Sequence, residues 1–296
     1  MECAKIYADY LKKFLKLEAN LRCVCDSSNG TVGSVLRRLK SNKLFIDLIN
    51  SSPDGKFPAH GPDPWAGGAM TDIISRVKKI KADFGAIFDA DGDRVFFVDD
   101  RGRLVPQEAV ALLLARDFPS PYLIDLRMGW LVKKSPLKFI ESRVGHYFIK
   151  RTMKAKNIKL GVEFSGHIYF ENKFGRNKSY FDSGIRAMVH FANAVGELNL
   201  AGQKLSSWLD SLPAYYRIKE TNFVVKNKRG TVKTIENIYR RRTNRVSHLD
   251  GLTMEFQDWW FNIRESNTEP LLRLNIEAKT PKIVSVEFKK LSGLIK

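Results

Sequence analysis

Three aspartates occupy alternate positions in one short stretch of the chain, Phe88-Asp89-Ala90-Asp91-Gly92-Asp93-Arg94. An apolar run ends at Phe88 and another begins at Val95, which predicts a loop between two strands. Carboxylate oxygens at this spacing can converge on a hard cation such as Mg²⁺, and a glycine lets the backbone bend between the ligands. We therefore predict a Mg²⁺ site whose ligands are Asp89, Asp91 and Asp93.

Two other kinds of loop share features of this stretch. A calcium EF-hand loop has glycine at its sixth position and glutamate at its twelfth, whereas this chain has Arg94 and Asp100 there. The predicted flanking elements are also strands instead of helices, so we set the EF-hand aside. The second alternative is an acidic surface turn without a metal, which the spacing alone leaves open.

A second polar set follows the apolar residues Leu160-Gly161-Val162. In an extended chain Glu163, Ser165 and His167 would point to the same side, because side chains alternate along a strand. A carboxylate, a hydroxyl and an imidazole on one surface suit the recognition of adjacent sugar hydroxyls and proton transfer near neutral pH.

A third set lies near the C-terminus, in Arg264-Glu265-Ser266-Asn267-Thr268-Glu269-Pro270. Guanidinium, hydroxyl and amide groups at the end of a strand can chelate a phosphate, and an arginine can bind it through two N–H groups. The alternative is a polar turn with no ligand. We predict a phosphate site formed by Arg264, Ser266, Asn267 and Thr268.

The elements that position these sets alternate between helical and extended patterns in the first two thirds of the chain. The predicted helices are 7–17, 31–40, 70–81, 107–116 and a helix from 184 to about 197, and the predicted strands are 21–25, 45–49, 84–88, 95–98 and 122–125. Gly30 ends a polar turn and can take a positive φ; the helix start after it could also bind an anion. The last third predicts a helix at 232–242 and strands at 222–226, 252–256, 259–263, 271–277 and 284–288.

This pattern predicts two consecutive α/β domains followed by a small α+β domain. We expect the boundaries 1–105 for the domain with the metal loop, 106–213 for the domain with the sugar-binding residues and 214–296 for the phosphate-binding domain.

Composition limits the classes of function. The 296 residues are 44% apolar, contain no apolar run long enough for a membrane span, and begin without the apolar segment of a signal peptide, so we expect a cytoplasmic protein with no membrane partner. The three cysteines are too sparse for a disulfide framework. A formal charge of +18 implies an anionic partner, either small phosphates or nucleic acid. No basic motif interleaved with aromatic residues favours nucleic acid, and we do not expect that partner.

The three polar sets together resemble a known family. The stretch F-D-A-D-G-D-R resembles the metal loop of the α-D-phosphohexomutase superfamily, which includes phosphomannomutases and phosphoglucomutases. E-F-S-G-H resembles its sugar-specificity loop, with Val162 as one extra residue after Gly161, and R-E-S-N-T-E-P matches its phosphate loop almost completely. The resemblance implies a Mg²⁺-dependent isomerase that moves phosphate between O1 and O6 of a hexose, and it does not distinguish glucose from mannose.

The resemblance also assigns roles residue by residue. The segment G-H-Y-F-I-K resembles a family segment that approaches the substrate phosphate, and Arg127 stands where the family commonly has a lysine. Arginine keeps the charge but is a poor proton carrier, which argues against acid or base catalysis at that position. The implied catalytic residues are Arg94, His146 and His167, and the implied substrate-binding residues are Arg127, Lys150, Glu163, Ser165, Arg264, Ser266, Asn267 and Thr268.

One family motif does not occur among these residues. The family's phosphoryl donor is a phosphoserine in T-x-S-H-N-P, and no S-H-N-P is present. We therefore expect the chain to bind hexose phosphate and hexose bisphosphate but to be incomplete as a mutase, with a phosphoserine domain supplied from elsewhere, such as a separate chain. The alternatives are a non-catalytic sugar-phosphate binding protein and, with less support, a nucleic-acid-binding protein.

Overall fold

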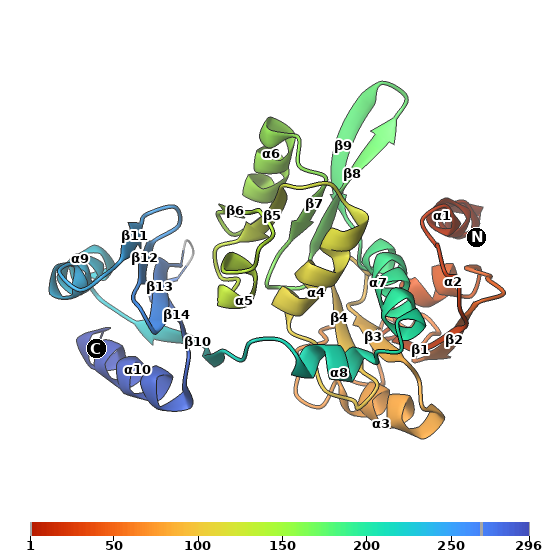
Figure 1. Cartoon of the computed structure of the whole chain (residues 1–296), viewed down its shortest axis with the longest axis horizontal. Coiled ribbons are helices and arrows are strands. Elements are labelled where there is room, and N and C mark those ends of the chain that lie inside the picture. The colour runs from red at the N-terminus through yellow and green to blue at the C-terminus, as the bar shows by residue number, and fades with distance from the viewer. Residues whose placement is uncertain (1, 267–268, 296) are drawn as a thin grey trace. The chain divides into compact units, whose positions relative to one another are not determined.

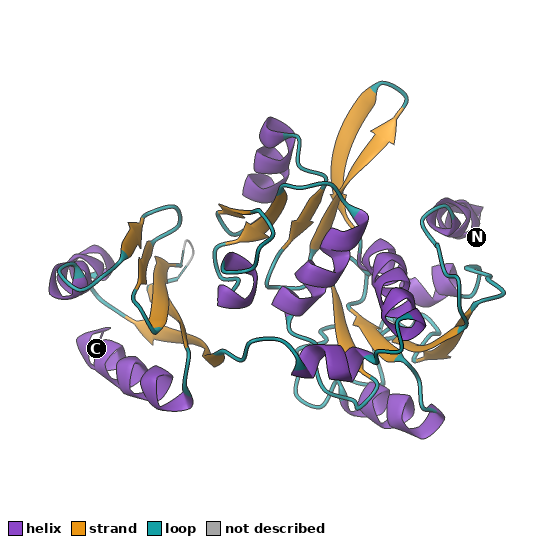
Figure 2. Cartoon of the chain, in the orientation of Figure 1, coloured by secondary structure: helices purple, strands orange, loops and turns teal. Residues whose placement is uncertain are grey.

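The computed structural model describes residues 2–266 and 269–295, and these residues form helices packed on three β-sheets (Figures 1 and 2). Two compact units are present. The first comprises residues 1–124, 136–140 and 149–212, and the second comprises 125–135, 141–148 and 213–296. The fold is the predicted one, two consecutive α/β regions followed by a smaller C-terminal region. The three predicted domain boundaries remain a prediction.

The first sheet carries the metal loop. Its strands lie in the order β2-β1-β3-β4, with β1 parallel to β2 and β3, and β4 antiparallel to β3. The elements are α1 (Glu2–Lys12), β1 (Leu21–Asp26), α2 (Val32–Leu36), β2 (Leu44–Ile49), α3 (Thr71–Ile80), β3 (Phe84–Phe88) and β4 (Val95–Asp99).

Alternation along these strands fills both faces of the sheet. Val24, Ile87 and Val98 pack against Ile73 and Val77 of α3 on one face. On the other face the ring of Phe97 stacks on Phe191 of α7 (Gly184–Leu200), with centroids 3.8 Å apart. Burial on both faces explains why both strands are apolar until an aspartate is reached. Asp89 directly follows β3, and Asp99 is the last residue of β4.

The turn after β1 does not use the positive φ that Gly30 could take. Positive φ angles are taken by Ser28 and Asn29, not by Gly30. Gly30 is required for space instead, because a Cβ there would lie 2.0 Å from the carbonyl oxygen of Ala90 in the metal loop. The N–H of Thr31 donates to the same oxygen at 2.9 Å, so this group supports the loop instead of being available to an anion.

The second sheet has the order β6-β5-β7-β8-β9, with β5 parallel to β7 and two antiparallel hairpin pairs beyond it. Its elements, with the helices that precede and follow, are α4 (Gln107–Leu114), η1 (Ala115–Asp117), β5 (Tyr122–Asp125), α5 (Trp130–Lys133), β6 (Phe139–Ser142), α6 (His146–Lys156), β7 (Leu160–Val162), β8 (Ile168–Phe174), β9 (Asn177–Asp182) and α8 (Leu205–Asp210). Ile149 and Met153 of α6 pack on Leu123 and Tyr169 of the sheet.

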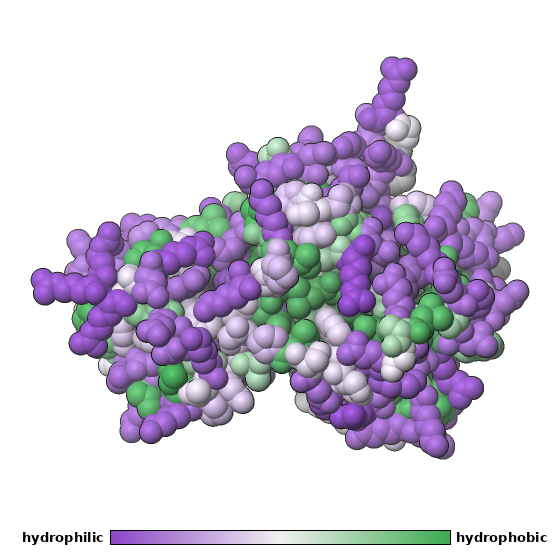
Figure 3. Space-filling model, viewed as in Figure 1, coloured by the Kyte–Doolittle hydropathy of each residue, from purple (hydrophilic) through white to green (hydrophobic). Residues whose placement is uncertain are grey.

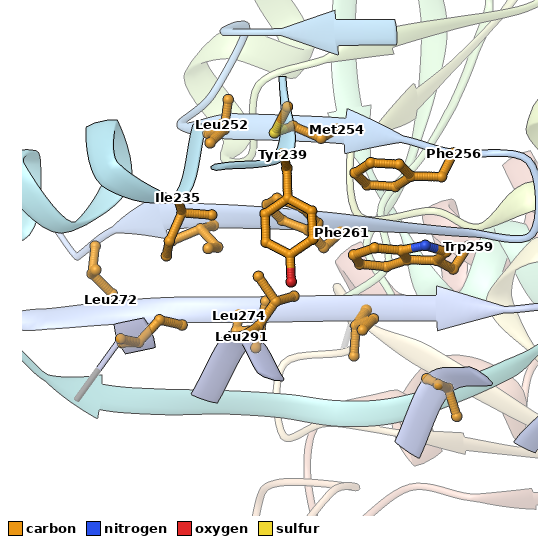
Figure 4. Packing of buried hydrophobic residues seen from close by; sticks show 14 of the residues in the cluster. Ile235, Tyr239, Leu252, Met254, Phe256, Trp259, Phe261, Leu272, Leu274 and Leu291 are labelled. Carbon is orange, nitrogen blue, oxygen red and sulfur yellow. The ribbon is translucent and has the colours of Figure 1, made fainter. Parts of the chain in front are cut away.

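The third sheet has the order β10-β14-β13-β12-β11 and is antiparallel throughout. Its elements are β10 (Tyr216–Val224), α9 (Lys228–Tyr239), β11 (Arg245–Ser247), β12 (Leu252–Glu255), β13 (Trp259–Glu265), β14 (Leu271–Ala278) and α10 (Pro281–Ile295). One face of the sheet, including Phe261 and Leu274, forms a core with Ile235 and Tyr239 of α9 and Leu291 of α10 (Figure 4). Alternation leaves polar residues on the opposite face.

The predicted strand at 284–288 is wrong, because this segment lies inside α10. The alternating apolar residues of V-S-V-E-F imitate a strand over five positions. The longer spacing decides the structure: Val284, Leu291 and Ile295 recur at helical intervals and are all buried in the core.

Other predicted elements are present with shifted ends. The first helix covers 2–12 instead of 7–17, and the helix predicted at 31–40 is limited to 32–36. Cys23 and Cys25 are buried thiols in β1, while Cys3 is exposed. No helix among the described residues has the length and apolar content needed to cross a membrane. Hydrophilic side chains cover most of the face shown in Figure 3.

Candidate functional site

The metal loop lies between the antiparallel strands β3 and β4, as predicted. One carboxylate oxygen from each of Asp89, Asp91 and Asp93 lies within 4.8 Å of the others. Asp89 is buried and Asp91 is exposed, so the carboxylate cluster extends from the protein interior to the surface. Gly92 has a φ of +79° and allows the tight bend between Asp91 and Asp93.

The charge of this cluster fits a divalent cation. Burial raises the pKa of Asp89, and its hydrogen bond with Asp93 raises it further, against the lowering effect of Arg94. Carboxylates that oppose each other's ionisation are stabilised by a cation between them. The donor set of Asp89, Asp91 and Asp93 therefore suits a divalent cation, and Mg²⁺ as its identity stays a prediction.

Arg94 contacts the loop that it ends. Its Nε donates to Asp89 Oδ2 at 2.6 Å, its backbone N–H donates to Asp89 Oδ1 at 3.1 Å, and one terminal nitrogen lies 3.4 Å from Asp63 Oδ1. These contacts give Arg94 a positioning role toward Asp89. Its predicted role toward the sugar stays a prediction.

The predicted sugar-binding residues do not form an extended strand. The chain turns tightly after β7: the N–H of Gly166 donates to the carbonyl of Glu163, and Gly166 has a φ of +95°. The prediction that Glu163, Ser165 and His167 point to one side of an extended strand is therefore wrong. The turn brings the same side chains together by another route, because it folds residue 167 back toward residue 163.

Short contacts join these three side chains. Ser165 Oγ lies 3.1 Å from His167 Nδ1, and Glu163 Oε2 lies 3.5 Å from the same nitrogen. Tyr169 OH donates to Glu163 Oε2 at 2.8 Å and fixes the carboxylate. Burial would lower the pKa of His167, but the hydrogen bond and charge of Glu163, together with Asp93, outweigh it and raise the pKa. The imidazole can thus carry a proton near neutral pH.

The sugar-binding turn and the metal loop are joined directly. Arg94 and His167 form an isolated antiparallel bridge, and the N–H of Val95 donates to the carbonyl of Gly166 at 3.1 Å. His167 Nε2 lies 3.5 Å from Asp93 Oδ2. Two sets of residues separated by about 70 positions therefore share one surface of the first unit. Lys150 belongs to the same unit, where its Nζ lies 3.0 Å from Asp182 Oδ1.

The second unit contains the predicted phosphate residues. Arg264 lies one residue before the end of β13, on the polar face of the third sheet. Ser266 is buried just beyond the strand, and its carbonyl accepts from Lys228 Nζ at 3.1 Å. Asn267 and Thr268 lie outside the described residues. Three further residues of the sheet, Glu220, Arg273 and Asn275, contact this region and were not predicted, because nothing in their local sequence indicates it.

Arg127 and His146 also belong to the second unit. Arg127 is buried, and its Nε and one terminal nitrogen donate to the two carboxylate oxygens of Asp125 at 3.1 and 2.8 Å. His146 is exposed at the first residue of α6. The predicted site residues are thus divided between the two units.

Most of the chain matches the models of one protein family. Family models for phosphoglucomutase/phosphomannomutase match residues 5–102 (alpha/beta/alpha domain II), 126–216 (alpha/beta/alpha domain III) and 220–288 (the C-terminal domain). The chain therefore belongs to the phosphoglucomutase/phosphomannomutase family, the α-D-phosphohexomutases, as its motifs predicted.

Individual relatives agree with this assignment. The chain is 33% identical to a phosphomannomutase of Methanocaldococcus jannaschii over 98% of its own length and 65% of that protein, and 32% identical to a phosphomannomutase of Escherichia coli over 92% and 62%. It thus spans slightly less than two thirds of the length of these relatives. A family protein of Burkholderia thailandensis has the same fold, with a TM-score of 0.83 at 24% identity over 97% of this chain and 63% of that one.

Proposed function

We propose that this chain binds Mg²⁺ and a hexose phosphate, and that these two binding sites take part in a phosphohexomutase reaction on glucose or mannose phosphates. The observation that carries the proposal is the bridge between Arg94 and His167, which joins the aspartate loop to the turn that contains Glu163 and Ser165. Family membership adds a substrate class, because relatives at 30% identity or more are named phosphomannomutases.

In this proposal the candidate residues have different roles, which follow from their side-chain chemistry. Glu163 and Ser165 offer an acceptor and a hydroxyl to neighbouring sugar hydroxyls, and His167 can hold or release a proton beside them. When bound by the three aspartates, Mg²⁺ supplies neutralisation of the charge that develops on a transferring phosphate. Arg264 and Ser266 would hold the phosphate that is not transferred, with Arg127, His146 and Lys150 as further candidate contacts.

The transfer itself needs a phosphoryl donor. None of these 296 residues forms the S-H-N-P motif of the family's phosphoserine. We propose that the donor comes from outside these residues, whether it belongs to the same polypeptide or to another. The absent motif is also what favours the second candidate function, a sugar-phosphate binding protein without catalysis.

Calorimetry tests the binding half of the proposal. The 296-residue chain is titrated with Mg²⁺, glucose 6-phosphate and mannose 6-phosphate. We expect binding of Mg²⁺ and of at least one sugar phosphate, and weaker Mg²⁺ binding by Asp91→Asn, which removes one charge from the cluster. Asp9→Asn is the matched control, because it removes an exposed aspartate that pairs with Lys12 at the surface. Failure of the wild type to bind any hexose phosphate would overturn the proposal.

A coupled mutase assay tests the donor. With Mg²⁺ and glucose 1,6-bisphosphate present, we expect no interconversion of the 1- and 6-phosphates by these residues alone, and some turnover when a family domain carrying the phosphoserine is added. Robust turnover without that domain would show a nucleophile within these residues. Binding without turnover in both conditions would favour the non-catalytic function.

A further inference from the structure

Two arginines of the third sheet lie directly opposite each other. Arg264 of β13 pairs with Arg273 of β14, and both side chains lie on the face away from α9 and α10, since their neighbours Ile263 and Leu272 are in the core. The two side chains are only 13% and 31% exposed. Like charges at directly opposed positions destabilise a sheet, and partial burial makes the repulsion stronger. This pair therefore needs an anion close by.

Glu220 of β10 provides that anion. Its Oε2 lies 3.1 Å from a terminal nitrogen of Arg264, and its Oε1 lies 3.9 Å from Arg273. Asn275 donates its side-chain N–H to Oε2 at 2.8 Å. Burial would raise the pKa of Glu220, but the charge of Arg264 and the hydrogen bond from Asn275 outweigh it and lower the pKa. The carboxylate is therefore charged at neutral pH.

A β-bulge aims Glu220 at the arginines. Along β10 the pairing with β14 shifts between Ile218 and Thr221, which face Ile276 and Leu274 respectively. Lys219 and Glu220 thus stand opposite the single residue Asn275. A bulge of two residues against one redirects a side chain that regular alternation would place elsewhere.

Each of the two arginines has a donor that meets no acceptor in the part of the chain that the structure describes. The Nε atoms of Arg264 and Arg273 are buried, and neither has a hydrogen-bond partner among the described residues. A buried N–H without an acceptor is costly, so two of them at one place indicate a ligand that brings acceptors. The oxygens of a phosphate group are such acceptors and suit arginine.

We propose that Glu220 is a built-in counter-anion that limits how tightly this arginine pair holds a phosphate group. The inference rests on the proposed function, in which Arg264 binds the phosphate of the sugar. In the free protein the carboxylate stabilises the opposed guanidiniums, and in the complex its charge opposes that of the phosphate a few ångströms away. The binding of the phosphate is thereby weakened, which favours its release.

Inorganic phosphate binding by the whole chain tests the inference through three variants. Glu220→Gln keeps the shape and an acceptor but removes the charge, and we expect about tenfold tighter phosphate binding. Glu220→Asp keeps the charge and should not bind more tightly than wild type. Glu269→Gln is the matched control: Glu269 lies 3.6 Å from Arg273 but its side chain is 54% exposed, so we expect a change of less than about threefold.

The outcomes separate this inference from the proposed function. A wild type that binds phosphate, with Glu220→Gln binding equally or more weakly, would overturn the counter-anion alone. Tighter binding by Glu220→Asp as well would overturn it too, because loss of packing would then explain the gain. Absence of phosphate binding in both wild type and Glu220→Gln would remove the proposed phosphate site.

An NMR measurement on the wild-type protein tests the same inference without requiring that any variant folds. In the ¹⁵N-labelled chain, saturating phosphate should shift the Nε–H resonances of Arg264 and Arg273, because these donors gain acceptors. Unchanged resonances at both arginines while phosphate binds would contradict the inference.

Discussion

Arg94 holds Asp89 at two points: its Nε lies 2.6 Å from Oδ2, and its backbone nitrogen lies 3.1 Å from Oδ1. Both residues belong to the same short loop, and Asp89 is buried while Arg94 is partly exposed. The arginine therefore fixes the orientation of the most deeply buried of the three carboxylates. Outer contacts of this kind set the geometry that a metal meets.

Replacing this arginine should weaken the cation site. Arg94→Lys keeps the positive charge but loses the Nε contact, and we expect Mg²⁺ affinity to fall by about 10- to 100-fold. Calorimetry with Mg²⁺ measures the change. Arg241→Lys, at an exposed position after α9, is the control and should bind Mg²⁺ like wild type. Equal affinities in all three proteins would show that Arg94 does not position the ligand.

Gly30 should be intolerant of any side chain. Gly30→Ala places a Cβ 2.0 Å from the backbone oxygen of Ala90, so the turn and the metal loop must separate. We expect a loss of about 1–3 kcal/mol in the free energy of unfolding and weaker Mg²⁺ binding. Gly55→Ala is the matched control, because nothing lies within 4 Å of its Cβ. Thermal unfolding and calorimetry measure both effects, and a Gly30→Ala variant indistinguishable from Gly55→Ala would contradict the packing.

Glu141 should make part of the stability depend on pH. Burial would raise the pKa of Glu141, but Lys133 at 2.8 Å and Arg245 at 2.6 Å outweigh it and lower the pKa. A carboxyl whose pKa is lower in the folded state stabilises the protein above its unfolded pKa of about 4.3, and this contribution is lost as pH falls through the folded pKa.

The variant Glu141→Gln measures this contribution. At pH 7 we expect it to be less stable by about 1.5–3 kcal/mol, the range for hydrogen bonds to charged groups. The difference from wild type should shrink as pH is lowered below about 4.3, because wild-type Glu141 then also becomes neutral. Denaturant unfolding of both proteins across this range gives the comparison, and a constant difference would mean that charge is not the cause.

The geometry of Arg264 should matter beyond its charge. Arg264→Lys keeps one positive charge but loses the planar pair of donors, and we expect glucose 6-phosphate to bind about tenfold more weakly, equivalent to about 1.4 kcal/mol. The matched control is Arg229→Lys on the exposed side of α9. Calorimetry at fixed ionic strength compares them, and unchanged affinity in Arg264→Lys would remove this residue from the phosphate site.

Much of this protein was predictable because its information is local. The three aspartates lie within five positions, between strands that are apolar on both faces, so a loop with converging carboxylates follows from the sequence itself. Family membership was predictable for the same reason, since each motif is a continuous stretch.

Tertiary structure decided what depends on partners far along the chain. The segment at 284–288 alternates like a strand, and only the core that also receives Leu291 and Ile295 makes it a helix. Glu220 reaches Arg264 because a bulge in β10 and the pairing of β13 with β14 bring together residues more than 40 positions apart. The local sequence determines which charged groups are present. The pairing of strands in the sheets determines which of these groups come into contact, and the electrostatic energy of a charged group depends on its burial and on its neighbours.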